Sequence, residues 1–505
     1  MNASRHPLLY QANTRVWLTR LGRQLGRPAT LDDLPDAELD ALAASGFDWI
    51  WMLGVWTTGA AGRGISRSNP EWRREFEQTL PDLTDDDIGG SCFAITGYTV
   101  AVALGGAPAL QRLRKRLAAR GLRLMLDFVP NHMAPDHPWV TDHPDHFISG
   151  TAEDLSQSPQ NYFRAADGAG GSGDTRIFAH GRDPYFPGWP DTVQLNYGNP
   201  AVQEAMAAEL ESIARQCDGV RCDMAMLLLP EVFRRTWGVE AADFWPTAIA
   251  RVRGKHPGFV VMAEVYWDLE WTLQQQGFDY CYDKRLYDRL RDGPATPVRD
   301  HLRAGLDFQD HLARFLENHD EPRAAATFHP GLHGAAAVVT YLTPGLRFFH
   351  QGQLEGFRKR ISPHLVRGPD EPVDRNLQSF YTTLLEVLKI PALRHGAWER
   401  LECVPAWDGN PTADDLLAFA WTGAAAERVL VTVNLAPHPS QCYVRLPWTD
   451  LAGKHHRLQD RMSAAVYDRD GEDLASRGLY LDLPEWHVHV FEVTVAGPVG
   501  DVPAA

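Results

Sequence analysis

The sequence predicts an α/β fold: a barrel of parallel strands, a subdomain inserted after the third strand, and a small antiparallel β-domain near the C-terminal end. Apolar runs of strand length recur along the first 390 residues, and stretches with helical periodicity separate them. Several runs end on a carboxylate or histidine, as expected where barrel strands end and their loops form a site. Together these observations favour a barrel enzyme.

The expected strands follow one another at intervals that leave room for helices. The candidate strands are residues 49–53, 122–129, 219–222, 259–263, 314–317 and 346–350. Amphipathic stretches at 109–119 and 202–215 repeat their apolar residues at helix spacing. Strand alternating with helix predicts a parallel sheet.

Two segments break this alternation and set the expected domain limits. Residues 133–200 are rich in Pro, Gly, Asp and aromatics, so we expect an inserted subdomain between barrel segments 1–132 and 201–390. Residues 391–496 contain short alternating stretches such as 428–434 and 488–493, which predict an antiparallel β-sandwich domain. Residues 497–505 are expected to form a frayed tail.

Composition excludes several classes of partner. The 505 residues are 44% hydrophobic and 23% charged, and their net charge of −16 disfavours nucleic acid, which needs a surplus of Lys and Arg. No stretch is apolar enough to span a bilayer, and the first residues do not resemble a secretion signal. Six scattered cysteines favour a reducing compartment, so a cytoplasmic location is expected. The sequence leaves the oligomeric state open.

Two carboxylates at successive strand ends suggest glycoside chemistry. Asp223 and Glu264 could meet across a cleft as the paired acids that glycoside cleavage requires. A lone Asp at a strand end is more often a helix cap or an ion-pair partner. Arg221 favours the catalytic interpretation, because a cation two residues earlier on the strand would keep Asp223 ionised. The apolar run before Glu264 would raise its pKa and suit a general acid.

Two histidines have matched settings beside asparagines. His132 follows Asn131, and His319 follows Asn318, each near the end of a strand-like run. Either histidine could be a hydrogen-bonding core residue or a ligand for substrate hydroxyls, and the matched settings favour the second role. No metal site is predicted, because the sequence has neither paired cysteines nor a helical His-Glu-x-x-His motif.

Four motifs in order resemble the signature regions of the α-amylase superfamily, glycoside hydrolase family 13. They are Asp127-Phe-Val-Pro-Asn-His132, Gly219-Val-Arg-Cys-Asp223, the isolated Glu264, and Asn318-His-Asp320. Residues 344–355 also resemble the family's eighth strand. The resemblance covers residues 8–390 well and the C-terminal domain loosely, and it implies a (β/α)8 TIM barrel.

The resemblance implies a role for each matched residue. Asp223 would be the nucleophile, Glu264 the general acid/base, and Asp320 the third carboxylate, which binds sugar hydroxyls and stabilises the transition state. Substrate-binding roles would fall to six further residues: Asp127, His132, Arg221, His319, Phe93 and Arg323. Phe93 stands where relatives place a stacking aromatic, and a plain core role for it remains open. The implied mechanism is double displacement, with the two carboxyl groups about 5 Å apart.

Two departures from the family pattern concern metal binding and the sugar subsite. Many amylases carry Lys-His after the nucleophile, whereas Met224-Ala-Met-Leu227 follows Asp223. This run argues against starch endo-hydrolysis and weakens the expectation of a calcium ion, although Asn131 could still bind one, so no cofactor is expected to be required. The position that often supplies an acidic partner for Arg323 is Gly90, and residues 85–87, all Asp, could substitute.

The predicted function is a retaining α-glycoside hydrolase acting on short α-glucosidic substrates, either small maltooligosaccharides or a related disaccharide. The alternative is a transglucosylase or disaccharide phosphorylase of the same superfamily, since a glycosyl-enzyme can be intercepted by a sugar or phosphate if water is excluded. A non-catalytic carbohydrate-binding barrel is a third class. It is disfavoured because such descendants usually lose a catalytic carboxylate, and all three are present here.

Overall fold

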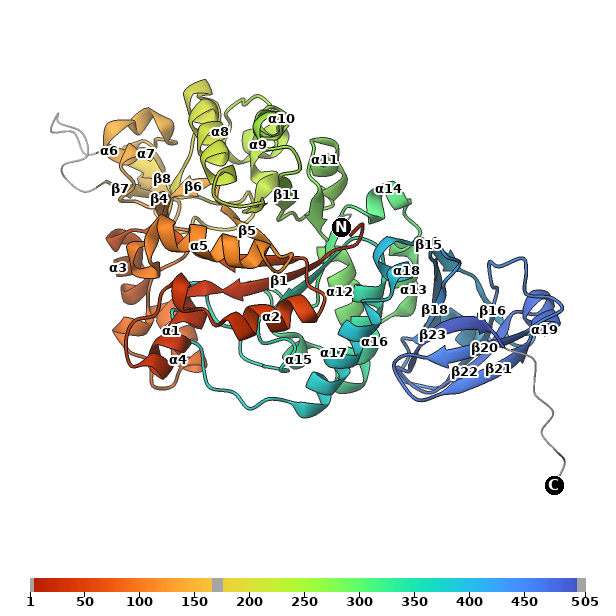
Figure 1. Cartoon of the computed structure of the whole chain (residues 1–505). Coiled ribbons are helices and arrows are strands. Elements are labelled where there is room, and N and C mark those ends of the chain that lie inside the picture. The colour runs from red at the N-terminus through yellow and green to blue at the C-terminus, as the bar shows by residue number, and fades with distance from the viewer. Residues whose placement is uncertain (1–3, 166–175, 497–505) are drawn as a thin grey trace.

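The computed structural model describes residues 4–165 and 176–496 of the chain (Figure 1). Within them, eight parallel strands close a barrel in the order β1-β14-β13-β12-β11-β10-β5-β2. The strands are β1 (Leu8–Asn13), β2 (Trp49–Leu53), β5 (Arg123–Phe128), β10 (Gly219–Cys222), β11 (Val260–Ala263), β12 (Tyr280–Tyr282), β13 (Leu312–Arg314) and β14 (Leu346–His350). The predicted barrel is confirmed.

Helices connect the strands and cover the outside of the barrel. The principal ones are α1 (Thr14–Leu25), α2 (Asp36–Ala44), α5 (Gly106–Ala118), α8 (Pro200–Ala214), α10 (Trp245–Lys255), α12 (Lys284–Asp292), α16 (Pro330–Leu342) and α17 (Arg375–Val387). Local chemistry sets their limits. The Asn13 side chain caps α1 by accepting from the Val16 amide, and Gly26, with φ 67°, ends it.

Most expected elements lie where the sequence places them, but the barrel contains strands that the pattern did not predict. β2, β10 and β14 coincide with the runs at 49–53, 219–222 and 346–350. β1 and the three-residue β12 were not predicted. The strand predicted at 314–317 was placed about two residues too late in the sequence. β13 ends at Arg314, and the chain continues through buried Phe315 and Leu316 as a loop. A buried loop whose backbone is not paired in a sheet has the same apolar sequence pattern as a buried strand.

The inserted segment leaves the barrel after β5 and returns before α8. It contains β6 (His132–Met133), α6 (Trp139–Asp142), α7 (Ala152–Gln157), β7 (Tyr162–Arg164), β8 (Ile177–Ala179) and β9 (Val193–Gln194). β6 pairs antiparallel with β9, and β7 with β8. The first pairing fastens the start of the insertion to its end, so His132 is held at the rim of the barrel.

The C-terminal region is built from two antiparallel sheets. The larger has the order β15-β17-β18-β23-β20-β21 and the smaller β16-β19-β22. Their strands include β15 (Ala397–Leu401), β16 (Cys403–Pro405), β17 (Leu416–Thr422), β19 (Ser440–Val444), β20 (His455–Asp460), β21 (Val466–Asp470) and β22 (Leu479–Leu483). Strands β18 (Arg428–Asn434) and β23 (Val488–Val495) correspond to the alternating stretches at 428–434 and 488–493. This region packs on the barrel helices, where the Trp421 indole donates to the Leu342 carbonyl at 2.7 Å. The expected tail at 497–505 lies outside the described residues.

Between residues 4 and 165 and between 176 and 496, no helix is long and apolar enough to cross a bilayer.

Candidate active site

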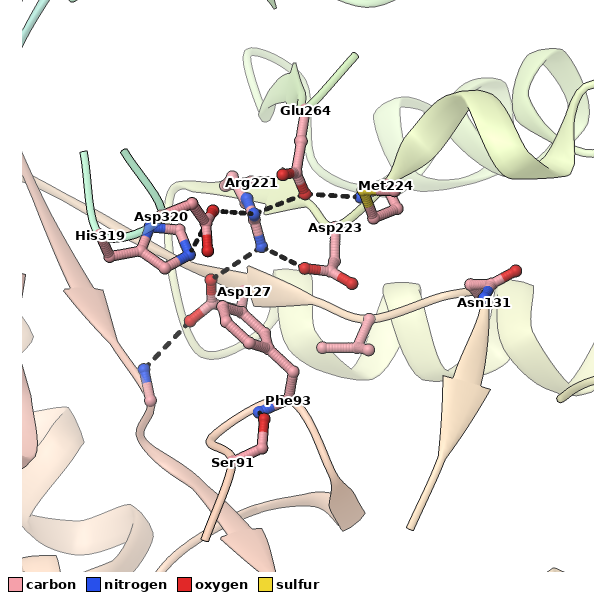
Figure 2. A network of polar contacts seen from close by, with 12 residues as sticks. Ser91, Phe93, Asp127, Asn131, Arg221, Asp223, Met224, Glu264, His319 and Asp320 are labelled. Atoms are coloured by element: carbon pink, nitrogen blue, oxygen red, sulfur yellow. Dashed lines mark hydrogen bonds and ion pairs between the residues drawn. The ribbon is translucent and has the colours of Figure 1, made fainter. Parts of the chain in front are cut away.

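The guanidinium of Arg221 lies at the centre of the predicted site. Arg221 is fully buried on β10, and four carboxylates from four segments surround it (Figure 2). Its nitrogens lie 2.6 Å from Asp223 and from Glu264, 3.8 Å from Asp127 and 4.0 Å from Asp320. The fold thus brings together the three predicted catalytic carboxylates, as expected where parallel strands end at one face of a barrel.

Asp223 and Glu264 share this cation through separate nitrogens. Arg221 Nη1 donates to Asp223 Oδ1, and Nη2 donates to Glu264 Oε2. Two further donors fix Glu264: the Met224 amide reaches Oε2 at 2.8 Å, and the Tyr266 hydroxyl reaches Oε1 at 2.9 Å. Met224 adopts a left-handed backbone with φ 43°, which is uncommon for a residue with a side chain. Strained backbone next to a reactive group is typical of functional sites.

Asp127 and Asp320 complete the cluster from opposite sides. Asp127 accepts from the Trp51 indole and the Gly54 amide, both at 3.1 Å, so its carboxylate is held in place by β2. Asp320 has a carboxylate oxygen 3.0 Å from His319 Nε2, and its side chain is 37% exposed. Asp127 is therefore buried as a supporting group, whereas Asp320 faces the opening of the site.

Aromatic rings line the space around Arg221. The guanidinium carbon lies 5.0 Å from the Phe93 ring centre and 5.3 Å from that of Trp51. His319 packs its ring 5.3 Å from Phe93 and 5.6 Å from Trp51. Phe93 therefore belongs to the site rather than to a remote part of the core. Its ring lies beside Asp127 in Figure 2.

The two histidines are placed differently. His319 contacts the carboxylate cluster directly, and its Nδ1 lies 2.9 Å from the Gln11 side-chain amide. His132 stands at the neck of the inserted segment, with its ring 5.3 Å from that of Trp189. Burial lowers the pKa of His132 to about 4 and that of His319 well below its ordinary value, so both rings are neutral at pH 7.

The carboxylates outnumber the cation, and this imbalance controls their protonation. Burial raises the pKa of Glu264 to about 7 and that of Asp127 to about 7, even though Arg221 favours their charged forms. Burial also raises the pKa of Asp223, and the same guanidinium opposes the shift. One buried cation cannot compensate four ionised neighbours. The cluster therefore retains protons at neutral pH.

Arg323 lies outside the carboxylate cluster. Its Nη1 donates to Glu317 at 2.6 Å and to the Gln351 carbonyl at 2.7 Å. The Asp residues at 85–87 were suggested as acidic partners of Arg323, but two of them bind other arginines. Asp87 pairs with Arg367, and Asp85 pairs with Arg73. The sequence pattern missed Glu317, which lies on the same loop as Arg323 and is itself buried.

Sequence reasoning also missed three residues that hold the site. Gln11 and Trp51 lie on barrel strands and reach His319 and Asp127, respectively. Tyr266 follows Glu264 by two residues and donates to it. Period-two alternation along the strands could have identified Gln11 and Trp51, since they share the inward face with other site residues.

The Asn131 side chain is hydrogen-bonded within the protein. Its side-chain oxygen accepts from Gln194 Nε2 at 3.0 Å, and Figure 2 shows the residue apart from the carboxylates. In the described residues, a group of three His, Cys, Asp or Glu ligands close enough to share an ion occurs only at His143, Asp145 and His146. Calcium prefers oxygen ligands in larger number.

Comparison with known proteins shows a similarity over the central part of the chain. The model described as "Alpha amylase, catalytic domain" matches residues 93–280, the span that contains Asp127, Arg221, Asp223 and Glu264. Over these residues the chain is similar to the α-amylase superfamily. The predicted resemblance is confirmed.

The curated relatives of this chain carry names that state different activities. "Alpha-amylase MalA" of Haloarcula japonica is 25% identical over 75% of this chain and 53% of its own length. An "Alpha-1,4-glucan:maltose-1-phosphate maltosyltransferase" of Rhodospirillum rubrum is 26% identical over 82% of this chain and 56% of its own length. The chain thus spans about half the length of these relatives.

The solved structures extend the similarity over the whole chain. A maltogenic α-amylase, AmyB of Thermotoga neapolitana, superposes with a TM-score of 0.69 at 17% identity, covering 98% of this chain and 99% of that one. At this identity the likeness concerns the fold. It includes the C-terminal β-domain, which sequence resemblance reached only loosely.

Proposed function

We propose that this chain is a retaining α-glycosidase that acts on short α-glucosidic substrates, small maltooligosaccharides or a related disaccharide. The observation that carries the proposal is the joint binding of Asp223 and Glu264 by one buried guanidinium, with Asp320 4.0 Å from the same group. A retaining glycosidase needs a nucleophile and an acid/base at short separation. Here a single cation fixes both carboxylates.

In the proposed reaction, Asp223 attacks the anomeric carbon while Glu264 gives its proton to the departing glycosidic oxygen. A covalent glycosyl-enzyme forms, and Glu264 then removes a proton from water, which attacks the same carbon, displaces the Asp223 carboxylate and restores the configuration. A Glu264 pKa of about 7 suits both displacement steps, because a group that first donates and then accepts a proton works best when its pKa lies near the ambient pH.

The remaining predicted residues are assigned to binding. Asp320 faces the opening and would accept hydrogen bonds from sugar hydroxyls, and neutral His319 and His132 would donate to others. Phe93 would pack against the apolar face of the sugar ring. Asp127, held by Trp51 and Gly54, would keep Arg221 in position.

Glycosyl transfer is the second candidate, and one structural feature favours it. The turn that follows the nucleophile, Ala225–Leu228, consists entirely of buried apolar side chains. Such a wall would reduce the access of water to a glycosyl-enzyme, so that a sugar or phosphate acceptor could compete. The maltosyltransferase names among the relatives are compatible with this alternative.

Proton NMR of the reaction products separates these candidates. The purified chain is incubated with maltose, maltotriose, longer maltooligosaccharides, sucrose and trehalose, and the first anomer formed is recorded. Early α-anomer with only smaller products supports the hydrolase. Longer or rearranged glucosides would indicate a transferase, early β-anomer would contradict retention, and no turnover would place the substrate outside simple α-glucans.

A further inference from the structure

A cavity of about 650 Å³ lies apart from the carboxylate cluster. Its wall is formed by α1 and the chain that follows it, by β3 (Trp56–Thr58) and by α3 (Ala60–Ser68), among other segments. The lining includes none of the three predicted catalytic carboxylates. It does include Gly54, whose amide donates to Asp127. The cavity is therefore separate from the active site but shares with it the chain that follows β2.

The charged side chains on the wall of this cavity all carry the same sign. Among the described residues, its lining includes no Asp or Glu and four cations: Arg15, Arg23, Arg27 and Arg63. Over the whole chain, acidic residues outnumber Lys and Arg by 65 to 49. Like charges gathered in one cavity repel one another unless an anion compensates them. The wall thus forms a positive site on an acidic protein.

Three of these four guanidiniums have no acidic partner. Arg27 pairs with Asp33. Within residues 4–165 and 176–496, no ion pair joins Arg15, Arg23 or Arg63 to a carboxylate. Arg23 and Arg63 are exposed, so a ligand in the cavity can reach them. Arg63 is also the fourth residue of α3, near the helix N-terminus, where the positive end of the helix dipole disfavours a cation. An anion in the cavity would compensate these charges.

Arg15 presents two free nitrogens at the wall. Its Nη2 donates to the carbonyls of Gly90, at 2.9 Å, and Pro363. Nε and Nη1 have no hydrogen-bond partner in the part of the chain that the structure describes, and neither is among the fully buried atoms that lack one, so both keep accessible surface. A side chain on Gly89 would place its first carbon 3.4 Å from Nη1, and one on Gly54 would place it 3.8 Å from Nε. Because both glycines line the cavity, the free edge of the guanidinium lies at its wall.

The chemistry of the wall suits a phosphate group on a larger molecule. Guanidiniums favour phosphate, because their planar N–H donors match its oxygens in pairs. The volume exceeds what a phosphate ion fills and lies in the range of pockets that take small organic ligands. Hydroxyl and apolar side chains supply the rest of the wall: Thr19, Thr58, Leu18, Trp56, Leu104 and Val366. A sugar-sized body attached to the phosphate would contact these residues.

We propose that this cavity binds a small phosphorylated molecule and that Arg15, Arg23 and Arg63 hold its phosphate group. The carboxylate cluster of the active site would repel the same ligand, because four acids surround its one cation. The two sites therefore select ligands of different charge. The ligand class follows from the arginines on this wall and does not depend on the reaction proposed for the active site.

The test is isothermal titration of the full chain at low ionic strength with glucose 6-phosphate and with inorganic phosphate, and glucose is the uncharged control. Arg23→Gln and Arg63→Gln each remove one exposed cation from the wall. Arg74→Gln is the matched control, since Arg74 is exposed on the neighbouring helix α4 (Pro70–Thr79) and lies outside the lining. Thermal unfolding of each variant checks the fold. Added salt should weaken the binding, because it screens exposed charges.

We expect the parent to bind glucose 6-phosphate but not glucose. Arg23→Gln and Arg63→Gln should each weaken this binding at least about tenfold, whereas Arg74→Gln should change it by less than about twofold. Binding of inorganic phosphate as well would place recognition on the phosphate group, and binding of glucose 6-phosphate alone would show that the cavity also holds the organic part, so both results support the site. No binding of either phosphate probe, equal binding of glucose, or the same affinity in all three variants would overturn the proposal.

Discussion

Two buried arginines of the barrel show how similar ion-pair chemistry gives opposite results. Arg221 on β10 faces four carboxylates, whereas Arg314 on β13 pairs with the single carboxylate of Asp283. Around Arg221, burial raises the pKa of Glu264 to about 7. Asp283 is equally buried, yet its charged partners lower its pKa to about 2. The number of acids per cation, rather than burial, distinguishes a proton-holding site from a structural pair.

Asp283 also illustrates the structural alternative that applies to any carboxylate after a strand. It follows β12 directly, as Asp223 follows β10, but its Oδ1 caps α12 by accepting from the Leu286 amide at 3.0 Å. Its Oδ2 lies 3.0 Å from His301 Nε2. Every acceptor of Asp283 is satisfied by the protein, which leaves no group for a substrate.

The largest expected effect is on turnover. Asp223→Asn should lower kcat by at least about 10³-fold, because the nucleophile is removed while the residue keeps its shape. The melting temperature should change little, since burial already raises the pKa of this carboxyl and thus disfavours its charged form. Initial rates and thermal unfolding measure both. Residual activity near that of the parent would contradict the assignment.

The matched substitution in the structural pair should act on stability. Asp283→Asn leaves Arg314 buried without its carboxylate and should lower the free energy of unfolding by about 3 kcal/mol. The kcat of the folded fraction should stay within a few-fold of the parent. Chemical denaturation with activity measured before and after checks this. An unchanged stability would remove the contrast between the two arginines.

The two sites should respond to pH in opposite directions. The lowered pKa of Asp283 stabilises the fold above the unfolded value of about 4, and this contribution is lost as the pH falls toward 2. The raised pKa of Glu264 favours the protonated form in the fold, so its contribution is present below about pH 4.5 and is lost as the pH rises through 7. Unfolding curves of Asp283→Asn and Glu264→Gln across pH separate the two contributions.

The raised pKa of Glu264 also predicts how activity falls on the alkaline side of the pH profile, called the alkaline limb. Turnover should decline above about pH 7 as the general acid loses its proton. Tyr266→Phe removes a donor to Glu264 Oε1, which stabilises the ionised form, so the limb should move to higher pH by about 0.5 to 1 unit. A pH profile of kcat/KM measures this smallest effect. A shift to lower pH would contradict the role given to Tyr266.

Much of the site could be predicted from sequence, because its residues follow apolar strands in a recognisable order. Asp223 and Glu264 meet beside Arg221 as their positions at strand ends suggested, and Asp127 and Asp320 join them as the family resemblance implied. The barrel and its insertion followed from the alternation of strand and helix.

The features of the site and fold that the sequence did not predict depend mainly on contacts between residues that no local sequence pattern connects. Gln11 reaches His319 across 308 residues of sequence, and no local pattern records that pairing. The partner of Arg323 was misjudged because Glu317 lies on its own loop and folds back to it. β12 has only three residues, too few for periodicity to reveal.

The most direct test of the central claim is intact and peptide mass spectrometry of Glu264→Gln incubated with α-D-glucosyl fluoride. This donor needs no acid to depart, and the variant lacks the base that would activate water, so a covalent intermediate should accumulate. The account predicts a mass increase of one glucosyl unit on the peptide that contains Asp223. No adduct, or an adduct on another residue, would contradict a double displacement through Asp223.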